Sequence, residues 1–188
     1  MRSSSNWIFA FLFLVISVRC NSQSGWLPQT CPAPKDCLWG VCFTDALTGA
    51  IAGEAGVLLT SDGGICWTRV SGGEGNYKAI SFPDASTVTA VGQDGIVIHT
   101  TDGGTTWICQ SSVPMKTLWG VSFIDANIGT AVGNDGTIVR TTNGGTDWIP
   151  QSSGTSKHLF CVDFIDAKTG FIGGDDGVIL RTTDEGET

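Results

Sequence analysis

Short apolar runs separated by polar, glycine-rich turns recur along the chain at a nearly constant interval. One unit opens with residues 118–123 (LWGVSF), continues through 129–132 (GTAV) and 137–140 (TIVR), and ends at 148–151 (WIPQ). Runs this short, with Gly, Asn and Asp between them, predict strands joined by tight turns. Four strands in a unit of about 40 residues are typical of one β-propeller blade.

Two independent markers keep the same period. The turn residues Asp62, Asp102, Asn143 and Asp184 are 40, 41 and 41 residues apart. The strand residues Phe43, Phe82, Phe123 and Phe164 are 39, 41 and 41 residues apart. The sequence therefore predicts an all-β propeller of four-stranded antiparallel blades, with four repeats present and the last one truncated.

A fragment of a further repeat precedes the first blade. Residues 26–30 (WLPQT) match residues 148–152 (WIPQS), and Trp26 lies 41 residues before Trp67. A fourth strand in this position can complete the last blade and remove an open sheet edge. We expect residues 26–30 to be a closing strand.

The first 22 residues carry the features of an export signal. Arg2 precedes an apolar run of twelve residues, 7–18, which is short against the roughly 20 residues that span a bilayer. The sequence thus predicts a signal peptide at 1–22, a propeller at 23–188, and a secreted or extracytoplasmic protein at the cell surface or in the periplasm. A membrane anchor and lipidation of Cys20 are the alternatives.

Charge and cysteine content limit the possible partners. Removing residues 1–22 moves the net charge from −8 to −10, which argues against general nucleic-acid binding. The six cysteines left in an exported chain make disulfides plausible, but six cysteines allow 15 pairings. Only Cys31 and Cys37 are close enough in sequence to suggest a local pair.

The repeated turn has a structural explanation. An Asp or Asn side chain accepts backbone N–H groups, glycine permits a positive φ, and the following Trp packs between blades. Asn143 supports this interpretation, because an amide accepts the same bonds but is neither a general base nor a charged metal ligand. The turn residues so assigned are Asp62, Gly64, Trp67, Asp102, Gly104, Trp107, Asn143, Gly145, Trp148, Asp184 and Gly186.

The pattern [ST]-x-[DN]-x-G-x-x-W resembles the Asp-box, or bacterial neuraminidase repeat. The flanking Leu-Trp-Gly-Val-x-Phe and Gly-x-Asp-Gly elements are similar to the photosystem II stability/assembly factor propellers. The resemblance covers residues 26–188 and implies a propeller of about seven blades, of which four are present here. It also implies two possible functions: photosystem II assembly in a thylakoid-facing compartment, or glycoside hydrolysis.

A sialidase-like site would need an arginine cluster, a Tyr–Glu nucleophile and an acidic proton donor. After residue 22 the arginines are Arg69, Arg140 and Arg181, and Tyr77 is the only tyrosine. Arg140 and Arg181 fall at the same repeat position, so we expect both on blade surfaces rather than in one site. We expect no catalytic residue, no cofactor and no metal.

The connections between blades suggest a binding surface. Lys35, Lys78, Lys116 and Lys157 lie at the ends of these connections, with His158 beside the last. Trp39, Trp119 and Phe160 follow at the strand starts. We expect a face formed by these residues to contact an acidic protein partner. The alternative is that the lysines only solubilise exposed loops and the aromatic residues belong to the core.

Overall fold

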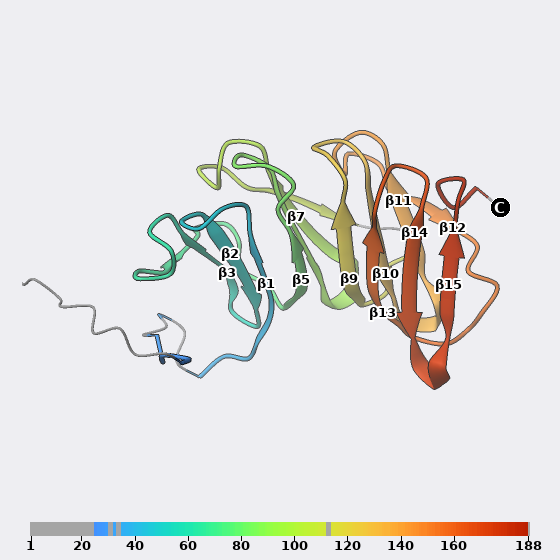
Figure 1. Cartoon of the computed structure of the whole chain (residues 1–188), viewed down its shortest axis with the longest axis horizontal. Coiled ribbons are helices and arrows are strands. Elements are labelled where there is room, and N and C mark those ends of the chain that lie inside the picture. Colours follow the sequence, from blue (N-terminus) through green and yellow to red (C-terminus); the bar gives the residue numbers. More distant parts are fainter. Residues whose placement is uncertain (1–24, 30–31, 33–34, 112–113, 188) are drawn as a thin grey trace, which may run out of the picture.

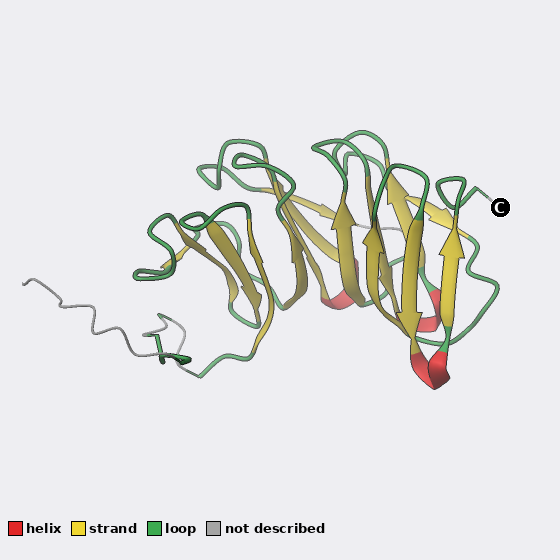
Figure 2. Ribbon diagram, in the orientation of Figure 1, coloured by secondary structure: helices red, strands yellow, loops and turns green. Residues whose placement is uncertain are grey.

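The computed structural model describes residues 25–29, 32, 35–111 and 114–187, so the expected signal peptide, Cys20 and Cys31 lie outside the described residues. The chain is all-β: four antiparallel sheets follow one another along the long axis of the molecule (Figure 1). Single turns of 3-10 helix lie at one end of the sheets (Figure 2). None of the helices in the described part is long and apolar enough to cross a bilayer.

Each sheet is one blade whose strands are paired in sequence order. Blade 1 contains β1 (Leu38–Phe43), β2 (Gly49–Gly53), β3 (Gly56–Thr60) and β4 (Thr68–Arg69). Blade 2 contains β5 (Tyr77–Ser81), β6 (Val88–Gly92), β7 (Ile96–Thr100) and β8 (Ile108–Ser111). Blade 3 contains β9 (Leu118–Phe123), β10 (Gly129–Gly133), β11 (Ile138–Thr141) and β12 (Ile149–Gln151). Blade 4 contains β13 (Leu159–Phe164), β14 (Gly170–Gly174) and β15 (Ile179–Thr182).

The first turn of each blade is held by an aspartate carboxylate. In blade 4, Asp166 accepts the backbone N–H groups of Lys168 and Thr169 at 2.8 and 2.7 Å. These bonds lower the pKa of Asp166. Asp45, Asp84 and Asp125 accept equivalent pairs of backbone bonds in the other blades. Repetition of these aspartates therefore reflects turn geometry.

The second turn of blades 2, 3 and 4 is an Asp-Gly pair inside a 3-10 turn: η1 (Gln93–Gly95), η2 (Asn134–Gly136) and η3 (Asp175–Gly177). Asp94, Asp135 and Asp176 have φ values of 55°, 55° and 54°, and the glycine that follows each is also left-handed. Two successive positive φ angles reverse the chain in step with the twist of a hairpin. Asp tolerates this region better than most residues, which explains the repeated Asp-Gly.

The hydrophobic core is divided among the spaces between blades. One cluster joins blades 1 and 2, a second joins blades 2 and 3, and a smaller third joins blades 3 and 4. In the second cluster, Val91 and Val97 of blade 2 pack against Val121 and Phe123 of blade 3. Blades 2 and 3 therefore each bury one face against the blade before and the other against the blade after.

The expected closing strand at residues 26–30 is not formed. Residues 26–29 lie in no strand, Trp26 is fully exposed, and residue 30 lies outside the described part. The sheet of blade 4 has the order β13-β14-β15. The described segment before β1 lies at the end of the molecule opposite β15 (Figure 1). Because the four blades form an open row and not a closed ring, this segment does not reach the edge of β15.

Candidate binding site on the inner strands

The first strand of each blade contains one residue with no partner on the second strand. In blade 1, Leu38 pairs with Gly53 and Gly40 pairs with Ala52, which leaves Trp39 as a bulge. A bulge turns its side chain away from the regular alternation of the strand. The bulged residues of the four blades are Trp39, Lys78, Trp119 and Phe160.

These four residues form a continuous row, because the strands that carry them, β1, β5, β9 and β13, contact one another in order. We call this set of residues the inner row. The Lys78 ammonium lies 4.0 Å from the ring centroid of Trp39 and 5.5 Å from that of Trp119. The two indoles meet edge to face at 6.5 Å, and Trp119 meets Phe160 in the same way at 6.2 Å. The row therefore consists of three aromatic rings in edge-to-face contact and one cation that lies over the two indoles.

Two features fix the centre of the row. The Trp119 indole N–H donates to the side-chain oxygen of Asn134 at 2.7 Å. Gly120 follows Trp119, and a Cβ at this position would come within 2.9 Å of the Phe160 carbonyl. Glycine thus lets β9 and β13 approach closely enough for the rings to touch. Trp39 and Phe160 remain about half exposed at 49% and 44%, so the row is open to a partner.

The structure separates the predicted lysines into two groups. Lys116 forms an ion pair with Asp135 at 2.7 Å, and Lys157 forms the equivalent pair with Asp176. The hydrogen bond from Lys116 lowers the pKa of Asp135. Lys116 and Lys157 therefore face aspartates of their own blades. Among the described residues, no carboxylate lies within ion-pair distance of Lys78.

The sequence analysis placed Lys78 with Lys116 at the end of a connection, whereas Lys78 lies inside β5 and is the equivalent of Trp119. Lys78 follows Trp67 by 11 positions, whereas Lys116 and Lys157 follow Trp107 and Trp148 by 9, so Lys78 is not their equivalent in the repeat. His158 lies beside Asp135, whose backbone N–H donates to its Nδ1 at 3.0 Å. Lys35 is exposed in the segment before β1.

The third turn of each blade is a hydrogen-bonded unit built on a threonine hydroxyl. In blade 2, Thr100 donates to the Asp102 carboxylate at 2.7 Å and accepts the Gly104 N–H at 3.1 Å. The Thr106 side chain and backbone also bond to Asp102, and together these bonds lower its pKa to about 2. In blade 3, Asn143 makes the same acceptor bond, to the Asp147 N–H at 2.9 Å.

The tryptophans after these turns pack against strand phenylalanines. Trp67 meets Phe43, and Trp148 meets Phe123, each edge to face with centroids 6.0 Å apart. The Trp107 N–H donates to the Gly104 carbonyl at 3.1 Å. The glycine at the same position of each turn has a φ of 78° to 88°, which only glycine adopts without strain. These glycines are Gly64, Gly104, Gly145 and Gly186. These contacts stabilise the turns and the packing of the blades.

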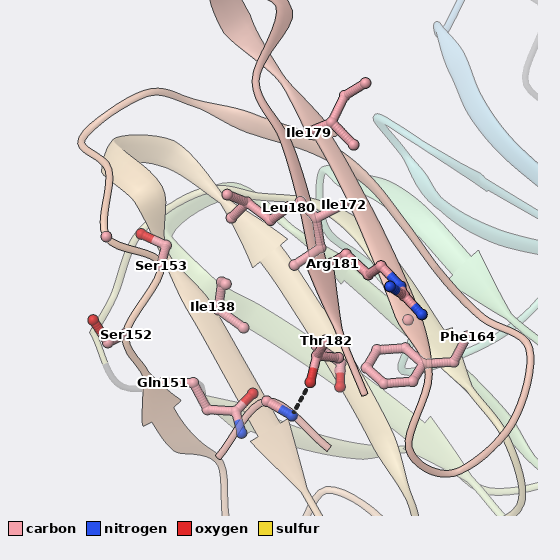
Figure 3. Close-up of a pocket in the computed structure, with 14 residues that line it drawn as sticks. Ile138, Gln151, Ser152, Ser153, Phe164, Ile172, Ile179, Leu180, Arg181 and Thr182 are labelled. Carbon is pink, nitrogen blue, oxygen red and sulfur yellow. Dashed lines mark hydrogen bonds between the residues drawn. The ribbon is translucent and has the colours of Figure 1, made fainter. Parts of the chain in front are cut away.

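A groove of about 470 Å³ lies between blades 3 and 4. Ile138 of β11 lines one side, while Phe164, Ile172 and Leu180 of blade 4 line the other (Figure 3). The turn at its end is closed by the Thr182 hydroxyl, which accepts the Gly186 N–H at 2.7 Å (Figure 3). In blade 3 the corresponding space beside Phe123 holds Trp148. The groove therefore has the walls that receive an indole in the preceding blade.

Arg140 is not on the blade surface, and the sequence-based expectation was wrong for this residue. Its side chain is buried between blades 3 and 4 and donates to Glu185 at 2.8 Å. Arg181, at the same repeat position, is exposed and lies over the Phe171 ring at 5.9 Å. The difference arises because blade 4 covers this face of blade 3.

Cys37, Cys42, Cys66, Cys109 and Cys161 are free thiols, so the expectation of disulfides is not met among them. The suggested Cys31–Cys37 pair involves a residue outside the described part. Within residues 25–29, 32, 35–111 and 114–187, no group of three His, Cys, Asp or Glu side chains is placed to hold a metal ion.

Comparison with known families gives one match, which covers residues 18–117 and 109–188: "Photosynthesis system II assembly factor YCF48". The chain belongs to this family. A search of curated proteins gave no sequence match.

Solved structures with the same fold include two YCF48 proteins. "YCF48 bound to D1 peptide" is 16% identical, with a TM-score of 0.51 and 80% of each chain covered. "YCF48 from Cyanidioschyzon merolae" is 18% identical, with a TM-score of 0.52, covering 84% of this chain and 69% of that one. An ancestral GH74 enzyme is 16% identical with a TM-score of 0.63, but the match covers only 23% of the enzyme and 79% of this chain. At these identities the likeness concerns the fold, which is that of a β-propeller.

Proposed function

We propose that this member of the photosystem II assembly factor family is a non-catalytic propeller module that binds an extended, acidic segment of a protein partner on its inner row. The observation that carries the proposal is the position of Lys78. Its ammonium lies over the rings of Trp39 and Trp119, and no carboxylate in the described part of the chain is within ion-pair distance of it. A cation without an ion-pair partner, beside the half-exposed ring of Trp39, suits a carboxylate flanked by apolar groups.

The spacing of the row favours a polypeptide. Its ring centroids are 6.5 and 6.2 Å apart. Side chains on one face of an extended chain repeat at about 6.6 Å, twice the rise of about 3.3 Å per residue. Alternate side chains of a bound strand, all on one face, would therefore meet successive rings of the row, and Lys78, over the first two rings, would select an acidic one.

A role in photosystem assembly is the finer form of this proposal. Support comes from family membership and from the solved complex of a YCF48 protein with a D1 peptide. We further propose that the protein acts outside the cytoplasm, in a secreted or thylakoid-facing location. The apolar run at residues 7–18 supports this part.

The test is a calorimetric titration of the chain with a D1 peptide and with each member of a library of acidic peptides. We expect micromolar binding to an acidic peptide and about a tenfold loss in the Lys78→Met variant, which keeps the aliphatic stem but removes the charge. Lys168→Met, at an exposed position in the first turn of blade 4, is the matched control and should bind normally. No binding to any peptide, or equal loss in both variants, would refute the proposal.

An enzyme assay separates this proposal from the alternative function. The same preparation is incubated with a broad panel of glycosides, because GH74 enzymes share the fold. We expect no hydrolysis. Turnover of any glycoside by the chain would overturn the non-catalytic part of the proposal and favour a glycosidase.

A further inference from the structure

A pocket of about 280 Å³ lies between blades 1 and 2, at the end of the sheets that carries the first and third turns. Leu59 and Asp62 of blade 1 line one wall, and Phe82, Ala85 and Gly103 of blade 2 line the other. Both walls belong to described blades that pack on one another. The pocket therefore combines a carboxylate with apolar surface at a boundary inside the row of blades.

The corresponding space at the other two boundaries is filled by a side chain of the third strand. Leu59, His99 and Arg140 are equivalent, because each directly precedes the threonine of its third turn. Between blades 2 and 3 the His99 ring stacks on Phe123, the equivalent of Phe82, with ring centroids 6.5 Å apart and an interplanar angle of 28°. Leu59 has no planar group to place there, and the space beside Phe82 stays open.

The boundary between blades 3 and 4 holds a guanidinium in this region. There Arg140 of blade 3 pairs with Glu185 of blade 4 at 2.8 Å, and the third turn of blade 3 carries the neutral Asn143. Between blades 1 and 2 the carboxylate is on the other wall: Asp62 has the position of Asn143, and Gly103 has the position of Glu185. Both residues line the pocket, so a cation placed in it would meet Asp62.

The turns around the pocket carry negative charge only. The first and third turns of blades 1 and 2 contain four aspartates and no Lys, Arg or His. These turns are residues 44–48, 61–67, 83–87 and 101–107. Among the described residues, no cation lies within ion-pair distance of these carboxylates. Hydrogen bonds from the turn, above all from the Cys66 backbone N–H, lower the pKa of Asp62, which is therefore ionised at neutral pH. The charge around the pocket favours a cationic ligand.

We propose that this pocket binds an arginine side chain of a partner protein. The planar guanidinium stacks on Phe82, as the His99 ring stacks on its own phenylalanine, and it donates to the Asp62 carboxylate, as Arg140 donates to Glu185. A lysine ammonium has no flat face to lie on the ring. The pocket is at the opposite end of the strands from the inner row, and this inference does not rest on the proposed function.

The test titrates the chain with the peptide Gly-Gly-Arg-Gly-Gly, acetylated and amidated so that the arginine carries its only charge, and follows the backbone amide signals by NMR. Three further peptides replace the arginine by citrulline, which keeps the shape without the charge, by lysine or by leucine. We expect the arginine peptide to shift the signals of Asp62, Cys66 and Ala85, and the other three peptides to bind more weakly. No shift of these signals, or equal affinity for any of the other peptides, would overturn the proposal.

A matched pair of variants separates the pocket from a general attraction to acidic turns. Asp62→Asn should keep its turn, because Asn143 serves in blade 3, and should lower the affinity for the arginine peptide about tenfold. Asp184→Asn removes the same charge from the equivalent turn of blade 4 and should leave the affinity unchanged. Equal losses in the two variants would refute a specific site.

A third variant tests the pocket without changing an acidic residue. Leu59→Arg copies the arrangement of Arg140 and supplies the guanidinium from the chain itself. We expect this variant to fold, since Leu59 is only partly buried, and to lose binding of the arginine peptide. Circular dichroism checks the folding of all three variants. Unchanged binding by a folded Leu59→Arg chain would place the peptide elsewhere and overturn the proposal.

Discussion

Arg140 and Glu185 form an ion pair across the boundary between blades 3 and 4, with Nη2 and Oε2 2.8 Å apart. Glu185 has a φ of 69°, at a position where the other three blades have glycine: Gly63, Gly103 and Gly144. The backbone at Glu185 is therefore strained. Its carboxylate neutralises the charge of the Arg140 guanidinium, which is buried.

Two substitutions that both remove the ion pair isolate the cost of the backbone strain. Glu185→Ala keeps the strained backbone and loses the ion pair, whereas Glu185→Gly loses the ion pair but relieves the strain. We expect Glu185→Ala to be less stable than Glu185→Gly by about 1 kcal/mol in urea denaturation. Equal stability of the two variants would show that the left-handed backbone costs nothing at this position.

Acid should destabilise the protein through Asp102. Its folded-state pKa is lowered from 3.8 to about 2, so its contribution to stability is full above about pH 4 and is lost as the pH falls through about 2. Asp102→Asn should retain the turn, because Asn143 serves in blade 3, but should show a smaller fall in melting temperature over this range. Identical pH profiles for the variant and the wild type would contradict this assignment.

The hydroxyl of Thr141 should contribute more to the stability of the fold than its methyl group. Thr141 is fully buried and accepts the Gly145 N–H at 2.8 Å. Thr141→Val leaves that buried N–H without its acceptor, which costs about 1–3 kcal/mol. Thr141→Ser keeps the acceptor and should lose less. Chemical denaturation of both variants checks the order, and greater damage from serine would refute it.

Equivalent tryptophans should differ in importance because their surroundings differ. Trp148 and Trp67 make the same edge-to-face contact, but the partner of Trp148, Phe123, is buried and the partner of Trp67, Phe43, is exposed. We expect Trp148→Ala to cost about 3–5 kcal/mol and Trp67→Ala clearly less. Equal losses by thermal and chemical denaturation would mean that Phe43 is covered in solution.

The repeating pattern predicted the blades because turn chemistry is local. Asp45, Asp94 and Asp102 each act within a few residues of their own position, so their spacing alone places the strands. The same period also contained the inner row, since Trp39, Lys78, Trp119 and Phe160 are 39, 41 and 41 residues apart. The sequence analysis grouped Lys78 with the other lysines at the ends of the connections, and this grouping hid its equivalence to Trp39, Trp119 and Phe160.

Properties that depend on how one blade sits against the next could not be read from the repeat. Arg140 is buried and Arg181 is exposed although they share a repeat position, because only Arg140 is covered by a following blade. The closing strand failed for a related reason. Whether residues 26–29 reach β15 depends on the angle between blades, which no local sequence pattern specifies.

The inner row as a protein-binding site is tested most directly by amide hydrogen exchange with and without an acidic peptide. The account predicts slower exchange on peptide addition at the starts of β1, β5, β9 and β13, around Trp39, Lys78, Trp119 and Phe160. It predicts no change at the third turns around Asp62 and Asp102. Protection confined to those turns, or no protection with any acidic peptide, would contradict it.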